Sequence, residues 1–203
     1  MAKIAAQDTL VLTIKLKILP QSQKQINTFN QTMIAYRDAC NVVSQYIFNN
    51  IPQAIDSHSL QSLLSYINLQ TTAKINGKRI YEILKKQFHL PAQLVCEVFK
   101  TVIANYKTVQ TQLKKEKIAN NFEYDSEGNI VYYQKGKHKS EPKLVYTYKD
   151  LSFLTKPLYY KKPQLALPVN RSYGFIDDFS QVSISSLDGR IKLPFKLTAY
   201  QKR

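Results

Sequence analysis

The sequence predicts an α+β fold in which a block of amphipathic helices lies between two β regions. Residues 9–19 alternate between apolar and polar side chains, as a strand with one buried face does. Residues 22–47 and 94–113 instead repeat their apolar side chains every three or four positions, which is the period of a helix packed on one side. Near the end of the chain, Asp188-Gly189 is a strong hairpin signal. A chain of 203 residues can bury a sizeable core, as one domain or two small ones.

The charge balance indicates a polyanionic partner. The chain contains 29 Lys and Arg against 14 Asp and Glu, a net charge of +15. This excess favours nucleic acid or an anionic membrane surface, and we expect nucleic acid. The sequence has no apolar run of membrane-spanning length and no signal-peptide core, so we expect a cytoplasmic protein without a membrane partner. The isolated thiols of Cys40 and Cys96 fit a reducing compartment.

The opening strand carries Lys15 and Lys17 on the face opposite its apolar side chains. These lysines either protect a sheet edge or contact nucleic acid. Ser22 is the expected N-cap of a first long helix. The apolar stripe of this helix consists of Ile26, Phe29, Met33, Tyr36, Cys40, Val43 and Ile47. Arg37 and Asn41 lie beside the stripe, where they either line a groove or face solvent.

The stretch from Lys78 to Lys117 combines a helical period with a dense set of cations. Pro91 suits the start of a helix, so a short helix should end before it and a long one should begin after it. The packing face of the long helix contains Leu94, Val98, Val102, Tyr106, Val109 and Leu113, and its other side contains Lys100, Lys107, Lys114 and Lys115. Gln93 in its first turn either bonds a base edge or a phosphate, or faces solvent. We expect the lysine side to bind an anion.

The remaining elements are expected to be short. One helix should cover residues 60–67, capped by Ser57 or Ser59, and Asn76-Gly77 is a turn signal. After Lys117, tyrosine and lysine become frequent, with a hairpin expected over residues 122–133 and strands over 144–148 and 164–169. A type I′ turn at Asp188-Gly189 would pair Val182 with Phe195, Ile184 with Leu193 and Ser186 with Ile191. Aromatic rings among cations can stack on bases, but they also commonly populate strands.

The sequence shows no residue set for catalysis. His58, His89 and His138 are each isolated from other metal-binding side chains. Asp177-Asp178 has no third carboxylate nearby in the sequence, so we interpret it as a turn or strand edge. No glycine-rich phosphate loop and no activated nucleophile can be recognised. We therefore predict no catalytic residue, no metal ligand and no bound cofactor within these 203 residues.

The order of these segments resembles the N-terminal half of TnpB, the transposon-encoded RNA-guided endonucleases related to compact type V CRISPR effectors. The matching segments are Thr9-Leu-Val-Leu-Thr-Ile-Lys-Leu-Lys17, Tyr36-Arg-Asp-Ala-Cys-Asn41, Phe88-His-Leu-Pro-Ala-Gln93, Val102-Ile-Ala-Asn-Tyr-Lys107, Asn170-Arg-Ser-Tyr173 and the closing hairpin. The resemblance implies a wedge-type antiparallel β-barrel, built from residues 1–20 and 120–203 and incomplete at its C-terminal end. An α-helical recognition lobe, residues 21–119, would be inserted between the two parts.

The resemblance also implies a function. The chain would be the recognition module of an RNA-guided DNA endonuclease, gripping guide RNA and the guide–target heteroduplex and reading a short target-adjacent motif. A RuvC-like nuclease half with Mg²⁺ and zinc would follow Arg203 and be a further partner beside guide RNA and target DNA, so enzymatic activity stays open. The alternative is a stand-alone basic RNA- or DNA-binding protein with a regulatory or translation-associated role.

Candidate nucleic-acid-binding residues follow from the same resemblance. By position, the channel would be lined by Tyr36, Asn41, Lys85, Lys86, Gln93, Lys100 and Lys107, and the RNA-facing side of the barrel by Lys161, Lys162, Asn170, Arg171 and Arg190. Further candidates are Lys15, Lys17, Arg37, Lys78, Arg79, Tyr106, Lys114 and Tyr173. The family's Asn-Arg-Asp-Tyr pattern has Ser172 in place of its aspartate here, so the role of that aspartate is unfilled.

Overall fold

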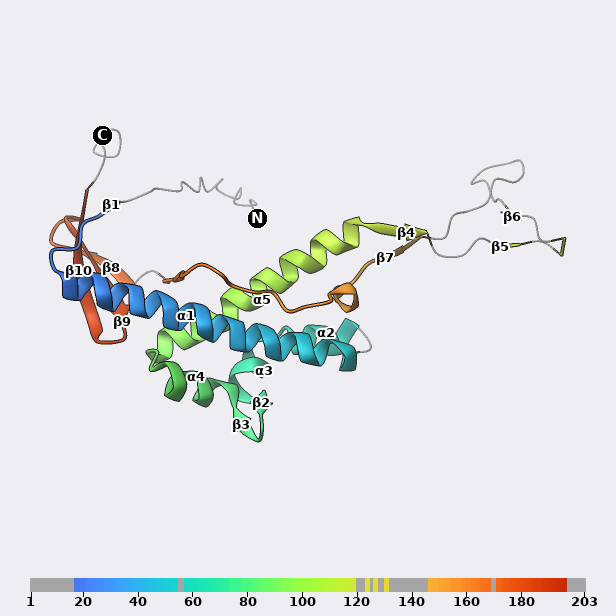
Figure 1. Ribbon diagram of the computed structural model, residues 1–203, viewed down its shortest axis with the longest axis horizontal. Helices are drawn as coiled ribbons and strands as arrows, with labels where there is room; N and C mark the ends of the chain where they lie inside the picture. The colour runs from blue at the N-terminus through green and yellow to red at the C-terminus, as the bar shows by residue number, and fades with distance from the viewer. Residues whose placement is uncertain are drawn as a thin grey trace, which may run out of the picture.

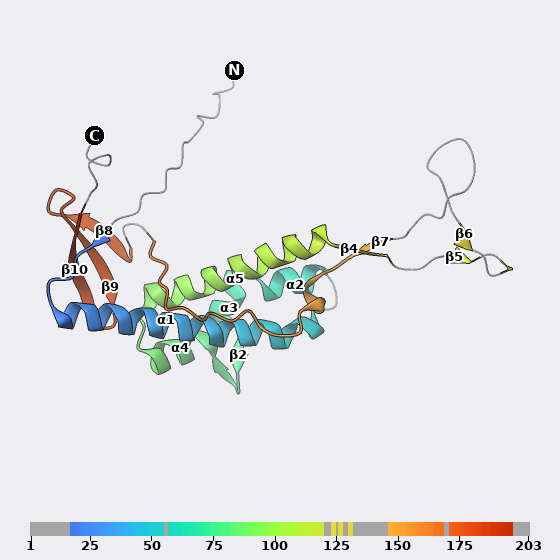
Figure 2. The same ribbon diagram turned by 45° about the horizontal axis from the view of Figure 1, so that its top comes forward.

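The fold is described by a computed structural model for residues 17–54, 57–119, 123–124, 126–127, 130–131, 146–168 and 171–196. Helices form the middle of the molecule, and a small antiparallel sheet lies at one end of them (Figures 1 and 2). The predicted α+β class is therefore confirmed.

The helices follow the predicted order. They are α1 (Gln23–Asn50), α2 (Ser57–Leu63), α3 (Tyr66–Thr71), α4 (Ile80–Phe88) and α5 (Ala92–Lys115), with 3₁₀ turns η1 (Ile51–Gln53) and η2 (Leu151–Phe153). Ser22 caps α1 as predicted, because its Oγ accepts a hydrogen bond from the Gln25 N–H at 3.2 Å. The single helix predicted over residues 60–67 is two helices instead, since Ser65 caps a new one at α3.

The junction between α4 and α5 lies where the sequence predicts it. His89 ends α4 in the left-handed conformation, with a φ of 53°. Pro91 immediately precedes the first helical residue of α5, where its fixed φ and missing N–H cost no hydrogen bond. Leu90 between them is 2% exposed, so the turn is anchored in the core.

The main sheet is open rather than closed. Its strands are β1 (Lys17–Ile18), β8 (Tyr173–Ile176), β9 (Gln181–Ser186) and β10 (Gly189–Lys196), in the order β1-β10-β9-β8. Among the described residues β1 and β8 are free edges, so the predicted wedge-type barrel is wrong. Closure would require the two edges to pair, and a sheet this narrow keeps them on opposite sides. Only residues 17–18 of the strand predicted over 9–19 can be compared, because residues 1–16 lie outside the described ones.

The hairpin between β9 and β10 has a different register from the predicted one. Ile184 pairs with Ile191, two residues away from its predicted partner Leu193. A type I′ turn at Asp188-Gly189 needs a positive φ at both residues, and only Gly189 has one, at 91°. The shift by two positions leaves each side chain on its predicted face, because faces alternate with a period of two.

Three two-stranded ladders complete the described β structure. β2 (Lys74–Ile75) pairs with β3 (Lys78–Arg79), β4 (Lys117–Ala119) with β7 (Tyr146–Tyr148), and β5 (Glu123–Tyr124) with β6 (Ile130–Val131). The turn predicted at Asn76-Gly77 is confirmed by φ values of 49° and 76°. The hairpin predicted over 122–133 is present in its described residues. The strand predicted over 164–169 is wrong for residues 164–168, which have no strand partner.

Residues 154–168 instead form an extended strap over the helices, drawn in orange in Figures 1 and 2. Leu165 and Leu167 pack against both hydrophobic cores. Leu165 and Leu167 are two residues apart, as the buried side chains of a strand are, but Ala166 between them also packs against the larger core. The strap therefore uses strand-like spacing without sheet hydrogen bonds.

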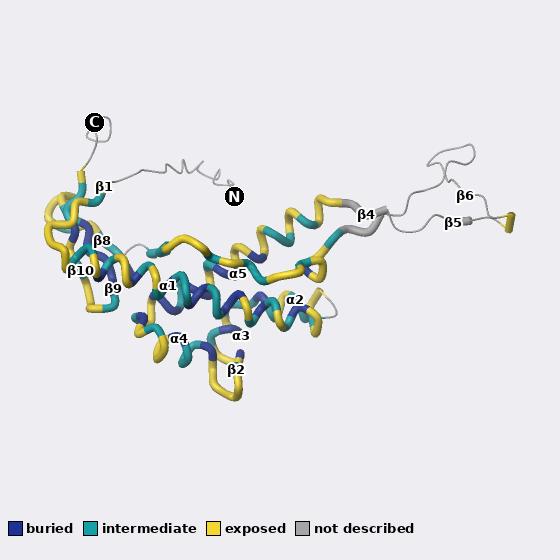
Figure 3. The backbone as a smooth tube through the Cα atoms, in the orientation of Figure 1, coloured by how far each residue is buried: buried dark blue, intermediate teal, exposed yellow. Residues whose placement is uncertain are grey.

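The larger core lies between the facing sides of α1 and α5, with α3 and α4 closing it (Figure 3). Its fully buried side chains include Tyr36, Cys40, Val43, Leu94, Phe99 and Tyr106. The smaller core is made by Val182, Ile184 and Leu193, with Phe29 of α1 against them. The predicted stripe of α5 is thus confirmed as a packing face, and so is that of α1 from Tyr36 to Ile47. In the first half of α1, Ile26 and Met33 are only half-buried, and the buried side chains are Thr28 and Thr32.

α1 also connects the helices to the sheet. The Thr28 hydroxyl donates to the Asp188 carboxylate at 2.9 Å, and the Leu187 N–H donates to Thr32 Oγ1 at 3.2 Å. Both contacts join α1 to the β9–β10 turn, so the turn is fixed by tertiary contacts as well as by its own conformation.

Candidate nucleic-acid interface

α5 carries a row of exposed lysines. Lys100, Lys107 and Lys114 are seven residues apart, which places them on one side of the helix at intervals of roughly 10.5 Å. Ala104 and Thr111 lie between them on the same side and are also exposed. Small side chains between cations leave space for the backbone of a ligand. The exposure of this lysine side is as predicted.

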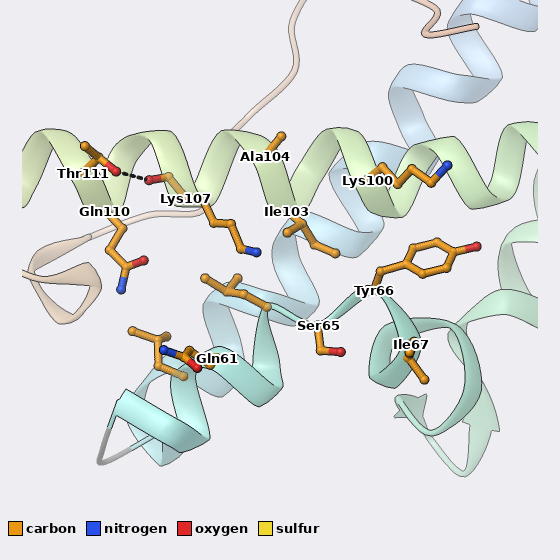
Figure 4. A pocket seen from close by; sticks show the side chains of 12 residues that line it. Gln61, Ser65, Tyr66, Ile67, Lys100, Ile103, Ala104, Lys107, Gln110 and Thr111 are labelled. Atoms are coloured by element: carbon orange, nitrogen blue, oxygen red, sulfur yellow. Dashed lines mark hydrogen bonds between the residues drawn. The ribbon is translucent and has the colours of Figure 1, made fainter. Parts of the chain in front are cut away.

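A groove of about 920 Å³ runs beside the row, between α5 on one side and α2 and α3 on the other (Figure 4). We call it the α5 groove. Its apolar lining consists of Leu60, Leu64, Tyr66, Ile67, Ile103 and Ala104, and its polar lining of Gln61, Ser65, Lys100, Lys107, Gln110 and Thr111. Figure 4 shows the Lys107 side chain reaching from α5 into the groove. The sequence does not predict this groove, because residues 60–67 and 100–111 meet only in three dimensions.

The two groove lysines differ in their partners. Lys100 Nζ lies 2.6 Å from Glu97 Oε1 and 5.7 Å from the centre of the Tyr66 ring. Lys107 has no carboxylate within 4.0 Å in the part of the chain that the structure describes. The charge of Lys107 is therefore available to a ligand, whereas that of Lys100 is partly offset.

Tyr66 is held in place at one end of the groove. Its ring lies edge-on to Phe99, with 6.5 Å between the ring centres. A tyrosine hydroxyl is uncharged at neutral pH, and burial raises the pKa of the Tyr66 hydroxyl further, to about 12. The groove thus combines a fixed neutral aromatic ring with two ammonium groups.

Tyr36 and Tyr106 lie in the core, which corrects their assignment to the nucleic-acid channel. Both are 0% exposed. Tyr36 Oη lies 2.7 Å from Thr101 Oγ1, and the Tyr106 hydroxyl donates to the Ser44 carbonyl at 2.9 Å. Burial raises the pKa of both phenols, so they remain neutral hydrogen-bonding groups. Both tyrosines belong to apolar helical stripes that are visible in the sequence, and this explains why their side chains are buried in the core.

Asn41 holds the strap, so both ends of its amide are already bonded within the protein, and its predicted role in the channel stays a prediction. Its Nδ2 donates to the Tyr160 carbonyl at 3.2 Å, and its Oδ1 accepts from the Tyr160 N–H at 2.8 Å. Nearby, the Ser44 hydroxyl donates to the Leu158 carbonyl at 2.6 Å, and Asn105 Nδ2 donates to Tyr160 Oη at 2.9 Å. These contacts fasten the strap to α1 and α5.

We expect Asn41→Ala to lower the free energy of unfolding by about 1–3 kcal/mol, because it leaves both backbone groups of Tyr160 without partners. Urea denaturation measures this change. Asn27→Ala is a matched control on the same helix, since Asn27 is exposed and, among the described residues, its side chain is hydrogen-bonded only to that of Gln23. This control should change the free energy of unfolding by no more than about 0.5 kcal/mol. Equal losses in the two variants would contradict the strap contact.

Three predicted guanidinium groups are engaged within the protein. Arg37 lies 2.7 Å from Asp38, and Arg79 lies 2.9 Å from Glu82. Arg190 donates to the hydroxyl and carbonyl of Ser183 and to a third oxygen, the Arg171 carbonyl. These pairs are at least partly exposed, so they reduce but do not abolish the ability of each arginine to meet a phosphate.

The other predicted residues are spread over several surfaces. Exposed ones are Lys17 in β1, Lys78 in β3, Lys85 and Lys86 in α4, Gln93 and Lys114 in α5, Lys161 and Lys162 in the strap, and Arg171 before β8. Tyr173 is half-buried against the smaller core, with its ring centre 5.9 Å from that of Phe175. Lys15 and Asn170 lie outside the described residues. The structure thus brings only Lys100 and Lys107 together at the groove.

A second basic surface lies on the sheet. Lys17 pairs directly with Lys196, so their side chains leave the same face of the sheet. Lys192 lies on that face too, four residues from Lys196 on β10. Lys192 and Lys196 alternate with Ile191, Leu193 and Phe195, so the sequence does indicate that these two lysines share one face of a strand. It does not indicate that this strand pairs with β1.

The described residues show no group of three or more His, Cys, Asp or Glu side chains that could hold a metal ion. Asp177 and Asp178 form the turn between β8 and β9, with φ values of 50° and 49°. Their interpretation as a turn is confirmed. Of the helices described, none is both long and apolar enough to span a membrane.

The segments that carry the resemblance to TnpB lie close to these features. Residues 36–41 belong to α1, residues 88–93 form the α4–α5 junction, and residues 102–107 border the α5 groove. Comparisons with protein families, with curated proteins and with solved structures gave no match to this chain. The resemblance therefore rests on the sequence motifs themselves.

Proposed function

We propose that this chain is a nucleic-acid-binding protein and that the lysine row of α5 contacts the phosphate backbone. The observation that carries the proposal is the exposed row Lys100, Lys107 and Lys114 beside the α5 groove. A small anion needs one or two cations, whereas cations repeated roughly every 10.5 Å suit a repeating polyanion. The net charge of +15 would attract such a ligand over distance.

The TnpB resemblance narrows this proposal to the recognition module of an RNA-guided DNA endonuclease. Such a module delegates sequence recognition to base pairing and needs mainly phosphate contacts and shape. Lysines separated by small side chains suit that task better than a cluster of base-reading groups. Nuclease activity, Mg²⁺ and zinc would then belong to a RuvC-like half outside these residues.

The test of this narrower proposal is co-purification. The chain is expressed in a cell that carries its native flanking DNA, and the RNA retained after a moderate-salt wash is sequenced. One dominant structured RNA, transcribed from beside the gene, is the expected result. A mixture of ribosomal and transfer RNA would instead support a stand-alone basic nucleic-acid-binding protein.

We expect Lys107→Ala to weaken binding to all RNA and DNA sequences about equally and to reduce the slope of log K against log salt by about one. The reason is the loss of one phosphate contact. Lys24→Ala is the matched control, because it removes the same charge from an exposed lysine of α1 that does not line the groove. Fluorescence anisotropy measures both. Equal effects would show that overall charge alone determines binding.

A further inference from the structure

We infer that the α5 groove takes the unpaired bases of a single strand, so that the protein prefers single-stranded nucleic acid to duplex. This inference rests on the general proposal that the lysine row of α5 binds nucleic acid, and it specifies the ligand of that site; the guide–target heteroduplex of the narrower proposal would bind at another surface. The lysine row alone fits either form of nucleic acid. The lining of the groove beside it is what separates them.

The first argument is the apolar lining of the groove. Leu60 is half-buried, Ala104 is exposed and Ile67 is 67% exposed in this lining, whereas Leu64 and Ile103 beneath them belong to the core. A duplex presents phosphates outward and keeps its bases stacked inside, so it would place charge against this apolar surface. An unpaired base instead offers a flat π-face that apolar and aromatic side chains can cover. The lining thus complements a base rather than a backbone.

The second argument is the position of two free amide side chains. Gln61 belongs to α2 and Gln110 to α5, and Figure 4 shows them projecting toward the space between those helices. Neither side chain has a hydrogen-bond partner among the described residues. An amide is both a donor and an acceptor, so it can bond the exposed edge of any base. Two such groups on opposite walls suit ligands of varied sequence.

The third argument is the distance between the cations. Lys100 and Lys107 are roughly 10.5 Å apart along α5, which equals about three nucleotides of a stacked strand at 3.4 Å each. A groove of about 920 Å³ has room for more than one base. A strand lying along α5 could therefore place phosphates at both lysines and its bases in the groove, with Tyr66 at one end.

The test uses a variant that places a large uncharged side chain in the groove and leaves the charge of the groove unchanged. Ala104 is exposed and lines the groove, so Ala104→Phe occupies space that a base would need. We expect its affinity for a single strand of about 12 nucleotides to fall at least about tenfold, because the added ring occupies the volume that the bases would take. Affinity for a duplex closed by a non-nucleotide linker, with the same number of phosphates and no unpaired base, should change less than about twofold.

Two further variants keep the test decisive. Gln112→Phe adds the same ring at an exposed position of α5 that does not line the groove, and it should change neither affinity. If Ala104→Phe does not fold, Ile67→Ser replaces it, since this exposed side chain is not needed for the core; it should weaken only single-strand binding. Circular dichroism verifies folding of each variant.

The outcomes separate the inference from the proposed function. Equal affinity of the unmodified protein for single strand and duplex, or an Ala104→Phe effect that is absent or equal for both ligands, would overturn the inference. The proposed function would survive these results if Lys107→Ala still weakened binding more than Lys24→Ala. It would fail if those two lysine variants behaved alike, whatever Ala104→Phe does.

Discussion

RNA binding is expected to weaken about a thousandfold when the salt concentration rises from about 50 mM to about 200 mM. About six phosphate contacts give a log–log slope near −5, because each contact releases a condensed counterion. Lys100, Lys107 and Lys114 of α5 supply part of this number, and the exposed lysines of β1, β10 and the strap can supply the rest. Anisotropy titrations at a series of salt concentrations measure the slope directly.

Removing the row as a whole tests where these contacts lie. The combined variant Lys100→Ala, Lys107→Ala and Lys114→Ala should reduce the slope by about three. A control that removes Lys24 and Lys74, two exposed lysines outside the groove, the strap, β1 and β10, should reduce the slope by less per lysine removed. Binding that stays constant from low to moderate salt would contradict the electrostatic basis of the proposal.

The largest expected loss of stability is that of Tyr106→Ala, about 3–5 kcal/mol of the free energy of unfolding. The Tyr106 side chain is 0% exposed between α1 and α5. Its hydroxyl donates to the Ser44 carbonyl at 2.9 Å and lies 3.1 Å from Ser44 Oγ, which in turn holds the strap. The substitution would leave a cavity and remove a partner from two buried polar groups.

Tyr106→Phe separates the ring from the hydroxyl. It keeps the packing and should cost about 1–3 kcal/mol, since only the hydrogen bonds are lost. RNA affinity of the folded variant should stay within about twofold of the unmodified protein, because a core residue does not touch the ligand. Urea denaturation followed by circular dichroism measures the stability. Full stability combined with lost RNA binding would return Tyr106 to the nucleic-acid interface.

The features predicted correctly depend on neighbours in the sequence. Ser22 caps α1 through a bond to a residue three positions away. Pro91 marks the start of α5 because of its own φ and missing N–H, and Asn76-Gly77 forms its turn from two residues that tolerate positive φ. The helical period likewise separates the packing face of α5 from its lysines. The part of the candidate site that α5 contributes could therefore be predicted.

The incorrect predictions depend on contacts between distant residues. The turn at Asp188 is fixed in part by Thr28, which lies 160 positions earlier, and its conformation shifted the strand register by two. The barrel required an edge-to-edge pairing that the four described strands do not make. The contact of the Asn41 amide with the backbone of Tyr160, 119 positions later, could not be predicted for the same reason.

By itself, the sequence determined the α+β class, the helices with their buried stripes, and the net charge of +15 on which the proposal of a polyanionic ligand is based. These follow from local periodicity, capping and composition. Only the tertiary structure decided that the sheet is open, that Asn41, Tyr36 and Tyr106 serve the fold, and that Lys107 stands over an apolar groove. The physical reason is that the two walls of the groove come from separate segments, α2 and α3 on one side and α5 on the other. The periodicity of each segment carries no information about the distance between the segments.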